Sequence, residues 1–127
     1  MSSLVGGTRI IGQDMVCGFG KKFPMKIKKW YNGWINVKTG ITQPTISSYP
    51  NSVYSDFVFL KANKTYEIVG LKLNAIARWR TYDKNKIYLH SSDGHVLKTT
   101  QDYFVRLLMF DKSYMGEVII KEVSQCL

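Results

Sequence analysis

Apolar and polar residues alternate with a period of two along most of the chain, which is the pattern of half-buried β-strands. Clusters of Gly, Asn, Asp and Pro separate the alternating segments, and few windows show the three- and four-residue spacing of an amphipathic helix. The pattern predicts strands over 53–60, 65–73, 75–82, 87–89, 103–110 and 117–123, with short segments at 27–30 and 34–37. We therefore expect an all-β protein of eight or nine strands, folded as an antiparallel sandwich or barrel.

The connections between these segments carry turn signals of their own. Asn32-Gly33 predicts a hairpin between the segments 27–30 and 34–37, because both residues tolerate positive φ. Residues 38–52 hold two of the three prolines and predict a long surface loop, and residues 91–94 predict a turn that ends on Gly94.

Length and charge narrow the range of functions. The chain has 127 residues without a repeat or a linker-like run, so we expect one domain over 1–127. Lys and Arg number 18 against 9 Asp and Glu, a net charge of +9. This balance favours a nucleic acid, an anionic polymer or an acidic protein as partner, without choosing among them. Nothing in the chain has the pattern of a signal peptide or a membrane span, so we expect no membrane partner.

The cysteines and histidines offer no metal site. Cys17 and Cys126 lie near opposite ends, and with only two His residues the chain has too few ligands for structural zinc. We expect two reduced thiols from synthesis in a cytoplasm, with a Cys17–Cys126 bridge as the alternative if the terminal strands are neighbours.

Catalytic chemistry finds no support in the sequence. His90 and His95 flank the 91–94 turn, but triad members are usually distant in sequence and brought together by the fold. No pair of carboxylates stands out as the acid and base of a glycosidase, and no phosphate-binding Gly-rich motif is present. We therefore expect a protein that is not an enzyme and needs no cofactor or metal.

A first candidate binding segment combines lysines with aromatic rings. Five lysines between 21 and 29 precede Trp30, Tyr31 and Trp34, and no acid occurs from Lys21 to Lys38. Charge beside ring faces suits single-stranded nucleic acid or an anionic wall polymer. The alternative is a solvated strand face whose lysines discourage edge-to-edge pairing.

A second candidate is the segment 75–82. Alternation places Trp79 on one face and Arg78, Arg80 and Tyr82 on the other. A sugar ring lays its C–H groups on an aromatic face and its hydroxyls against fixed donors, so these residues suit a saccharide subsite. The alternatives are that Trp79 belongs to the core and that Arg106, in an otherwise apolar strand, pairs with an acid such as Asp56 or Glu67.

Several phrases, in this order, resemble the carbohydrate-binding-module-like jelly rolls of phage and prophage tail, baseplate and adsorption proteins of Gram-positive hosts. The phrases are residues 4–9 (LVGGTR), 59–68 (FLKANKTYEI), 77–86 (ARWRTYDKNK), 99–100 (TT), 103–107 (YFVRL) and 116–123 (GEVIIKEV). Asn63 stands where the family usually has Gly, and residues 10–52 depart most from its pattern.

The resemblance implies a jelly-roll β-sandwich that binds cell-wall saccharide of the host without chemistry. It implies a virion location after synthesis in the host cytoplasm, with other tail proteins and copies of the chain as partners. The alternatives are a purely structural oligomerisation domain of the virion and a basic single-stranded nucleic-acid binder. The expected ligand-binding residues are Arg78, Trp79, Arg80, Tyr82, Arg106, Trp30 and Trp34.

Overall fold

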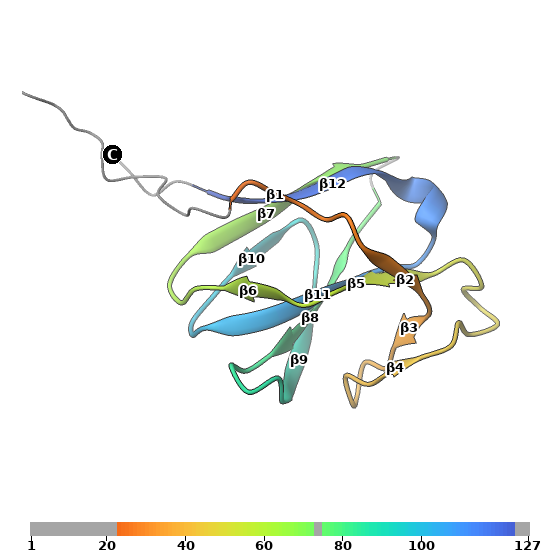
Figure 1. Cartoon of the computed structure of the whole chain (residues 1–127), viewed down its shortest axis with the longest axis horizontal. Coiled ribbons are helices and arrows are strands. Elements are labelled where there is room, and N and C mark those ends of the chain that lie inside the picture. The colour runs from red at the N-terminus through yellow and green to blue at the C-terminus, as the bar shows by residue number, and fades with distance from the viewer. Residues whose placement is uncertain (1–22, 73–74, 124–127) are drawn as a thin grey trace, which may run out of the picture.

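Two antiparallel sheets pack face to face in the computed structural model, which describes residues 23–72 and 75–123 (Figure 1). The four-stranded sheet has the order β1-β12-β7-β10, and the larger sheet has the order β2-β5-β11-β8-β9 with β6 also paired to β11. β3 and β4 form a separate pair. The predicted all-β antiparallel sandwich is thus confirmed. The strands are β1 (Met25–Lys26), β2 (Trp30–Asn32), β3 (Trp34–Ile35), β4 (Thr42–Gln43), β5 (Val53–Ser55), β6 (Val58–Leu60), β7 (Thr65–Leu71), β8 (Arg78–Tyr82), β9 (Tyr88–Asp93), β10 (Val96–Lys98), β11 (Tyr103–Met109) and β12 (Met115–Glu122).

The core lies between the two sheets and follows the period of two. Alternate residues of β11 (Tyr103, Val105 and Leu107) point inward, where they meet Tyr66 and Ile120 of the four-stranded sheet. The regularity of β7 and β11, seven residues each, explains why the sequence pattern located them well.

The predicted hairpin at Asn32-Gly33 is wrong. β2 pairs with β5 and β3 pairs with β4, so the chain changes partner at Gly33 instead of folding back on itself. Gly33 has a φ of +152°, and a Cβ there would lie 2.6 Å from the carbonyl oxygen of Gln43. A glycine is needed here because two chain segments approach closely. The Asn-Gly sequence does not distinguish this requirement from that of a hairpin turn.

Residues 34–51, which we call the covering segment, lie over the outer face of the six-stranded sheet. Tyr82 Oη donates to the carbonyl oxygen of Gly40 at 2.6 Å, and Tyr88 Oη donates to that of Val37 at 2.6 Å. Gly40, within the predicted surface loop, is therefore bonded to β8, and Ile35, earlier in the covering segment, is completely buried.

Two further strand boundaries differ from the prediction. The segment 53–60 is broken at Asp56 and Phe57 into β5 and β6, which pair with successive parts of β11. The turn expected at 91–94 comes later, because β9 continues through Asp93 and the chain reverses at Gly94, whose φ is +115°.

A bulge in β12 shapes one end of the four-stranded sheet. Met115 lies opposite Leu71 and Ile119 lies opposite Val69, so three residues of β12 face one residue of β7. That residue is Gly70, with a φ of +93°, and a Cβ there would collide with the carbonyl oxygen of Glu117. Gly70 thus lets the two backbones approach closely enough for the bulge to form.

Some expectations fall on parts of the chain that the structure does not describe. Cys17, Cys126 and the lysines at 21 and 22 lie outside the described residues. Within the described part, no helix has the length and apolarity needed to cross a membrane.

Candidate ligand-binding groove

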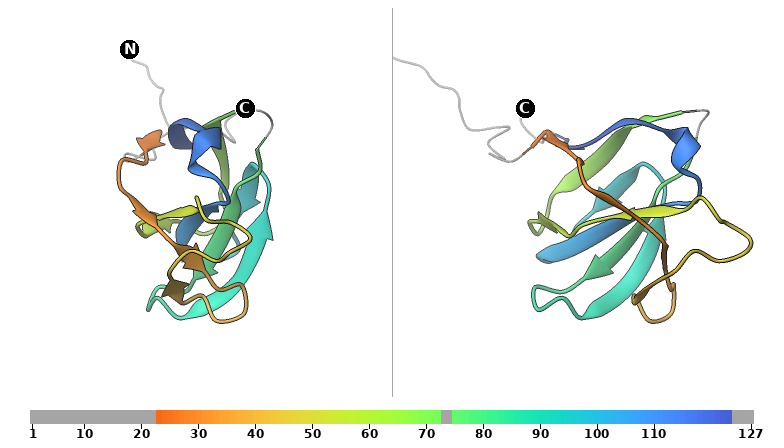
Figure 2. Two further views of the ribbon diagram at one scale, coloured as in Figure 1. Left: turned by 90° about the vertical axis from the view of Figure 1, so that its right-hand side faces the viewer. Right: turned by 45° about the vertical axis from the view of Figure 1, so that its right-hand side comes forward.

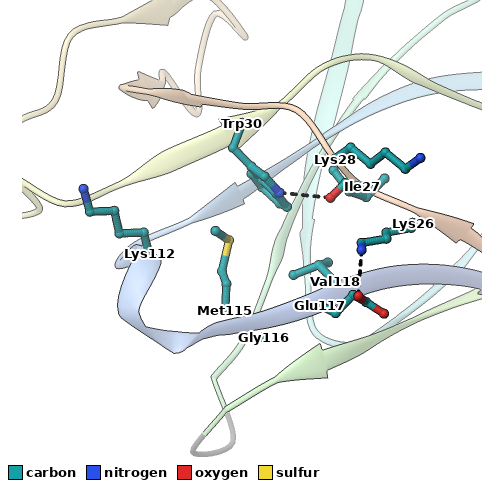
Figure 3. Close-up of a pocket in the computed structure, with 9 residues that line it drawn as sticks. All are labelled: Lys26, Ile27, Lys28, Trp30, Lys112, Met115, Gly116, Glu117 and Val118. Carbon is teal, nitrogen blue, oxygen red and sulfur yellow. Dashed lines mark hydrogen bonds and ion pairs between the residues drawn. The ribbon is translucent and has the colours of Figure 1, made fainter.

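An open groove runs between the segment 26–30 and the start of β12, with a volume of about 490 Å³ (Figure 3). Its size falls within the range of small-molecule sites. Trp30 and Met115 face one another across its middle, and the ion pair of Lys26 with Glu117 lies at one end. We call it the Trp30 groove; it is lined by Lys26, Ile27, Lys28, Trp30, Lys112, Met115, Gly116, Glu117 and Val118.

Local structure fixes the walls of the groove. Trp30 begins β2, and its indole Nε1 donates to the carbonyl oxygen of Ile27 at 3.3 Å, which orients the ring. The amide of Ile27 donates to the carbonyl oxygen of Val118 at 2.9 Å, and this bond joins the segment 26–30 to β12 on the other wall. The bulge residues 116–118 form this second wall, in keeping with the frequency of bulges beside functional sites.

The charges of the groove are mostly positive. Lys26 Nζ lies 2.6 Å from Glu117 Oε2, and this contact lowers the pKa of the Glu117 carboxyl below its usual range. Lys28 and Lys112 form no ion pair with another described residue. The groove thus carries a paired donor and acceptor together with two further ammonium groups.

This arrangement suits a ligand that is apolar on one side and rich in hydroxyls on the other. The Trp30 indole is half-buried against the core, and the part of it that lines the groove can contact the C–H groups of a sugar ring. The ammonium of Lys26 can donate to a hydroxyl and the carboxylate of Glu117 can accept from one. Among the described residues, no three His, Cys, Asp or Glu side chains gather as metal ligands.

Trp79, the aromatic residue expected in a saccharide subsite, is fully buried in the core. Its Nε1 donates to the carbonyl oxygen of Gly94 at 2.9 Å, and Leu107 lies opposite it on β11. This corresponds to the structural alternative considered for Trp79, because a ring with no exposed surface presents no face to a ligand.

Arg80 and Tyr82 do not lie on an exposed face, contrary to expectation. The covering segment buries both, leaving 3% of Arg80 and 4% of Tyr82 accessible. Burial lowers the pKa of the Arg80 guanidinium and raises that of the Tyr82 hydroxyl to about 12. Their polar atoms bond to the covering segment and to β9, so both residues hold the fold together.

Arg78 and Trp34 also have structural partners. Arg78 Nε lies 3.2 Å from Asp93 Oδ1, with its guanidinium over the ring of Phe110. Trp34 stacks on Tyr49 with ring centroids 5.3 Å apart and also packs against Phe110. One face of the Trp34 ring is thereby occupied.

Arg106 lies in a second aromatic cluster on the outer face of the six-stranded sheet. Its guanidinium lies between the rings of Tyr54 and Phe57, 4.9 and 4.3 Å from their centroids, and Nε donates to the carbonyl oxygen of Ser55 at 3.0 Å. Asp56, one of the two predicted acid partners, is 3.9 Å from Nη2. The cation covers the ring faces here, so this cluster offers less stacking surface than its aromatic content indicates.

The basic segment that precedes Trp34 is divided among several surfaces. Trp30 lines the groove, whereas Lys29 lies over the ring of Tyr31, which stacks on Tyr54 of the outer face. Of the seven expected ligand-binding residues, Trp30 is the one in the groove. Its partners Met115 and Glu117 were missed, because no local pattern reveals that residues 26–30 and 112–118 meet.

Comparison of the chain with models of known families, with curated proteins and with solved structures finds no match.

Proposed function

We propose that this domain binds a saccharide, without chemistry, in the Trp30 groove. The observation that carries the proposal is the half-buried Trp30 ring, which lines the groove opposite Met115, with the Lys26–Glu117 pair beside it. The ring and the thioether offer apolar contacts, and the charged pair offers one donor and one acceptor. Oriented polar groups around an apolar surface are what a small-molecule site requires.

The resemblance of the chain to phage tail jelly rolls supports a specific setting. On that reading the saccharide belongs to the cell wall of a Gram-positive host, and the domain belongs to the adsorption device of a virion. Other tail proteins and further copies of the chain are the expected partners. One shallow groove gives modest affinity, which display of many copies raises.

The proposal is tested with Trp30→Ala in a glycan array and a pull-down with purified Gram-positive cell walls. We expect the parent protein to bind and the variant to lose at least about tenfold in affinity, as for a central aromatic contact. Parent-like binding by folded Trp30→Ala protein contradicts the proposal, as does a parent that binds no glycan and no wall.

Two controls keep this test independent of folding, since Trp30 also packs against the core. Glu117→Ala removes the acceptor of the charged pair and leaves the core untouched because Glu117 is exposed, and we expect it to weaken binding of a neutral glycan while the melting temperature stays within about 2 °C of the parent. Tyr31→Ala removes the neighbouring ring, on the opposite face of β2, and should leave binding unchanged.

A further inference from the structure

The charge balance of the Trp30 groove goes beyond what a neutral sugar needs. Three of its four charged side chains are lysines, and Glu117 compensates one of them, Lys26, at 2.6 Å. Lys28 and Lys112 are exposed and form no ion pair with the described residues. The groove therefore carries a net charge of about +2, and a ligand with a negative group is attracted to it.

Lys112 is held in place at one end of the groove. It begins the short 3₁₀ turn η2 (Lys112–Tyr114), and its amide donates to the carbonyl oxygen of Asn51 at 3.0 Å. The neighbouring Asp111 carboxylate accepts from the amide of Ser113 at 2.9 Å, so it is engaged with the backbone. The backbone of Lys112 is thus anchored, and its ammonium forms no ion pair with a described residue. The pKa of the adjacent Asp111 carboxyl is lowered by its hydrogen bonds with Ser113 and, less strongly, by the charge of Lys112.

The two ends of the groove differ in what they can bind. Lys112 stands on one side of Trp30 and Met115, and the Lys26–Glu117 pair stands on the other (Figure 3). The Lys28 side chain points away from Trp30, so it adds attraction from a greater distance. The Lys112 side chain also extends away from Trp30, so its ammonium is placed for an acidic group that projects beyond a ring over Trp30, while the Lys26–Glu117 pair lies on the other side.

We propose that the groove is specific for an acidic saccharide, whose carboxylate or phosphate is held by Lys112 while its hydroxyls meet Lys26 and Glu117. This inference rests on the proposed saccharide binding and names the class of ligand. A charge-assisted contact to the acidic group is about twice as strong as a neutral hydrogen bond, so the charge decides between otherwise similar sugars.

The test compares polymers that differ in charge alone, on the full-length protein. The probes are polygalacturonate with its fully methyl-esterified form, and phosphorylated dextran with plain dextran, bound at 0.1 and 0.5 M NaCl. We expect at least one charged polymer to bind about tenfold more tightly than its neutral counterpart at 0.1 M, with the advantage reduced at 0.5 M. Which charged polymer binds distinguishes a carboxylate from a phosphate.

Variants separate recognition in the groove from general attraction to a basic protein. Lys112→Gln should lower affinity for the charged polymer about tenfold and leave the neutral one unchanged. The matched control is Lys98→Gln, an exposed lysine on β10 at the opposite edge of the same sheet. Equal losses in the two variants, or equal binding of charged and neutral polymers, overturns the inference.

The variant Trp30→Ala distinguishes failure of this inference from failure of the proposed function. If the parent binds charged and neutral polymers equally and Trp30→Ala binds neither, the domain binds saccharide in the groove but does not prefer acidic ligands. Unchanged polymer binding in Trp30→Ala removes both.

Discussion

The guanidinium of Arg80 donates two hydrogen bonds to the carbonyl oxygen of Ile35, from Nε at 3.3 Å and from Nη2 at 3.0 Å. A third bond runs from Nη1 to Ser91 Oγ at 2.5 Å. Arg80 thus ties the covering segment to β8 and β9 with one side chain. Because the group is buried and its pKa is lowered chiefly by that burial, these bonds replace hydration that the folded protein does not supply.

Arg80→Ala should therefore destabilise the fold, by about 2–3 kcal/mol, since it leaves the Ile35 carbonyl without its donor. The measurement is the midpoint of urea denaturation. Arg78→Ala on the same strand should cost less, because its partner Asp93 is largely exposed. Equal midpoints for Arg80→Ala and the parent would show that the covering segment does not depend on this contact.

Trp79→Ala should cost about 3–5 kcal/mol, because it empties the largest fully buried side chain of the core. Thermal denaturation measures the loss, and Tyr114→Ala, at an exposed ring, provides a control with little effect. A melting temperature close to that of the parent contradicts the central place of Trp79 in the core.

Stability should fall as the pH rises from 10 to 12, and Tyr82 should carry part of the fall. Its folded pKa of about 12 lies above the unfolded value of 10.0, because burial disfavours the tyrosinate. The stabilisation is fully present below pH 10 and is lost as the pH passes through 12. Burial raises the pKa of Tyr66 and Tyr88 in the same direction.

Tyr82→Phe isolates this contribution. It removes the hydroxyl that donates to Gly40, at a cost of about 1 kcal/mol near neutral pH, and makes stability less dependent on pH between 10 and 12. Urea midpoints at pH 9 and 11 for both proteins measure the difference. Identical pH dependence in the two proteins refutes the assignment to Tyr82.

Gly70→Ala should destabilise the protein and impair the groove together. The φ of +93° disfavours any side chain, and the added Cβ meets the backbone of Glu117, so the bulge must shift. We expect a loss of more than about 1 kcal/mol in urea denaturation and weaker saccharide binding. Gly94→Ala is the control: it also has positive φ, but its Cβ has open space. Saccharide binding unchanged in Gly70→Ala would separate the bulge from the groove.

The sequence predicted what depends on local alternation. β7 and β11 lie at the positions that their period of two indicates, because one face of each packs on the core and the other does not. The same rule failed for β8. Its outer face is covered by residues more than 40 positions earlier, so Arg80 and Tyr82 are buried although alternation placed them outside.

The candidate site was predicted only through Trp30. An aromatic residue beside lysines is visible in the sequence, but the opposite wall comes from residues 112–118, at the other end of the chain. The bulge that forms this wall depends on Gly70 in the neighbouring strand β7. In the sequence, nothing distinguishes Gly70 from any other glycine in a strand. In the described part of the lysine segment, neighbours in sequence face different surfaces of the sandwich: Lys28 lines the groove and Lys29 lies over the ring of Tyr31.

The bulge in β12 has a consequence for how such a domain can diversify. Glu117 lies between the last paired residue before the bulge, Met115, and the first after it, Ile119, so no side chain of β7 constrains its identity. If the groove binds saccharide as proposed, single mutations at position 117 would alter ligand preference without changing the strand register. Residue 117 could then change with the ligand, while the adjacent paired residues of β12 are retained because the fold requires them.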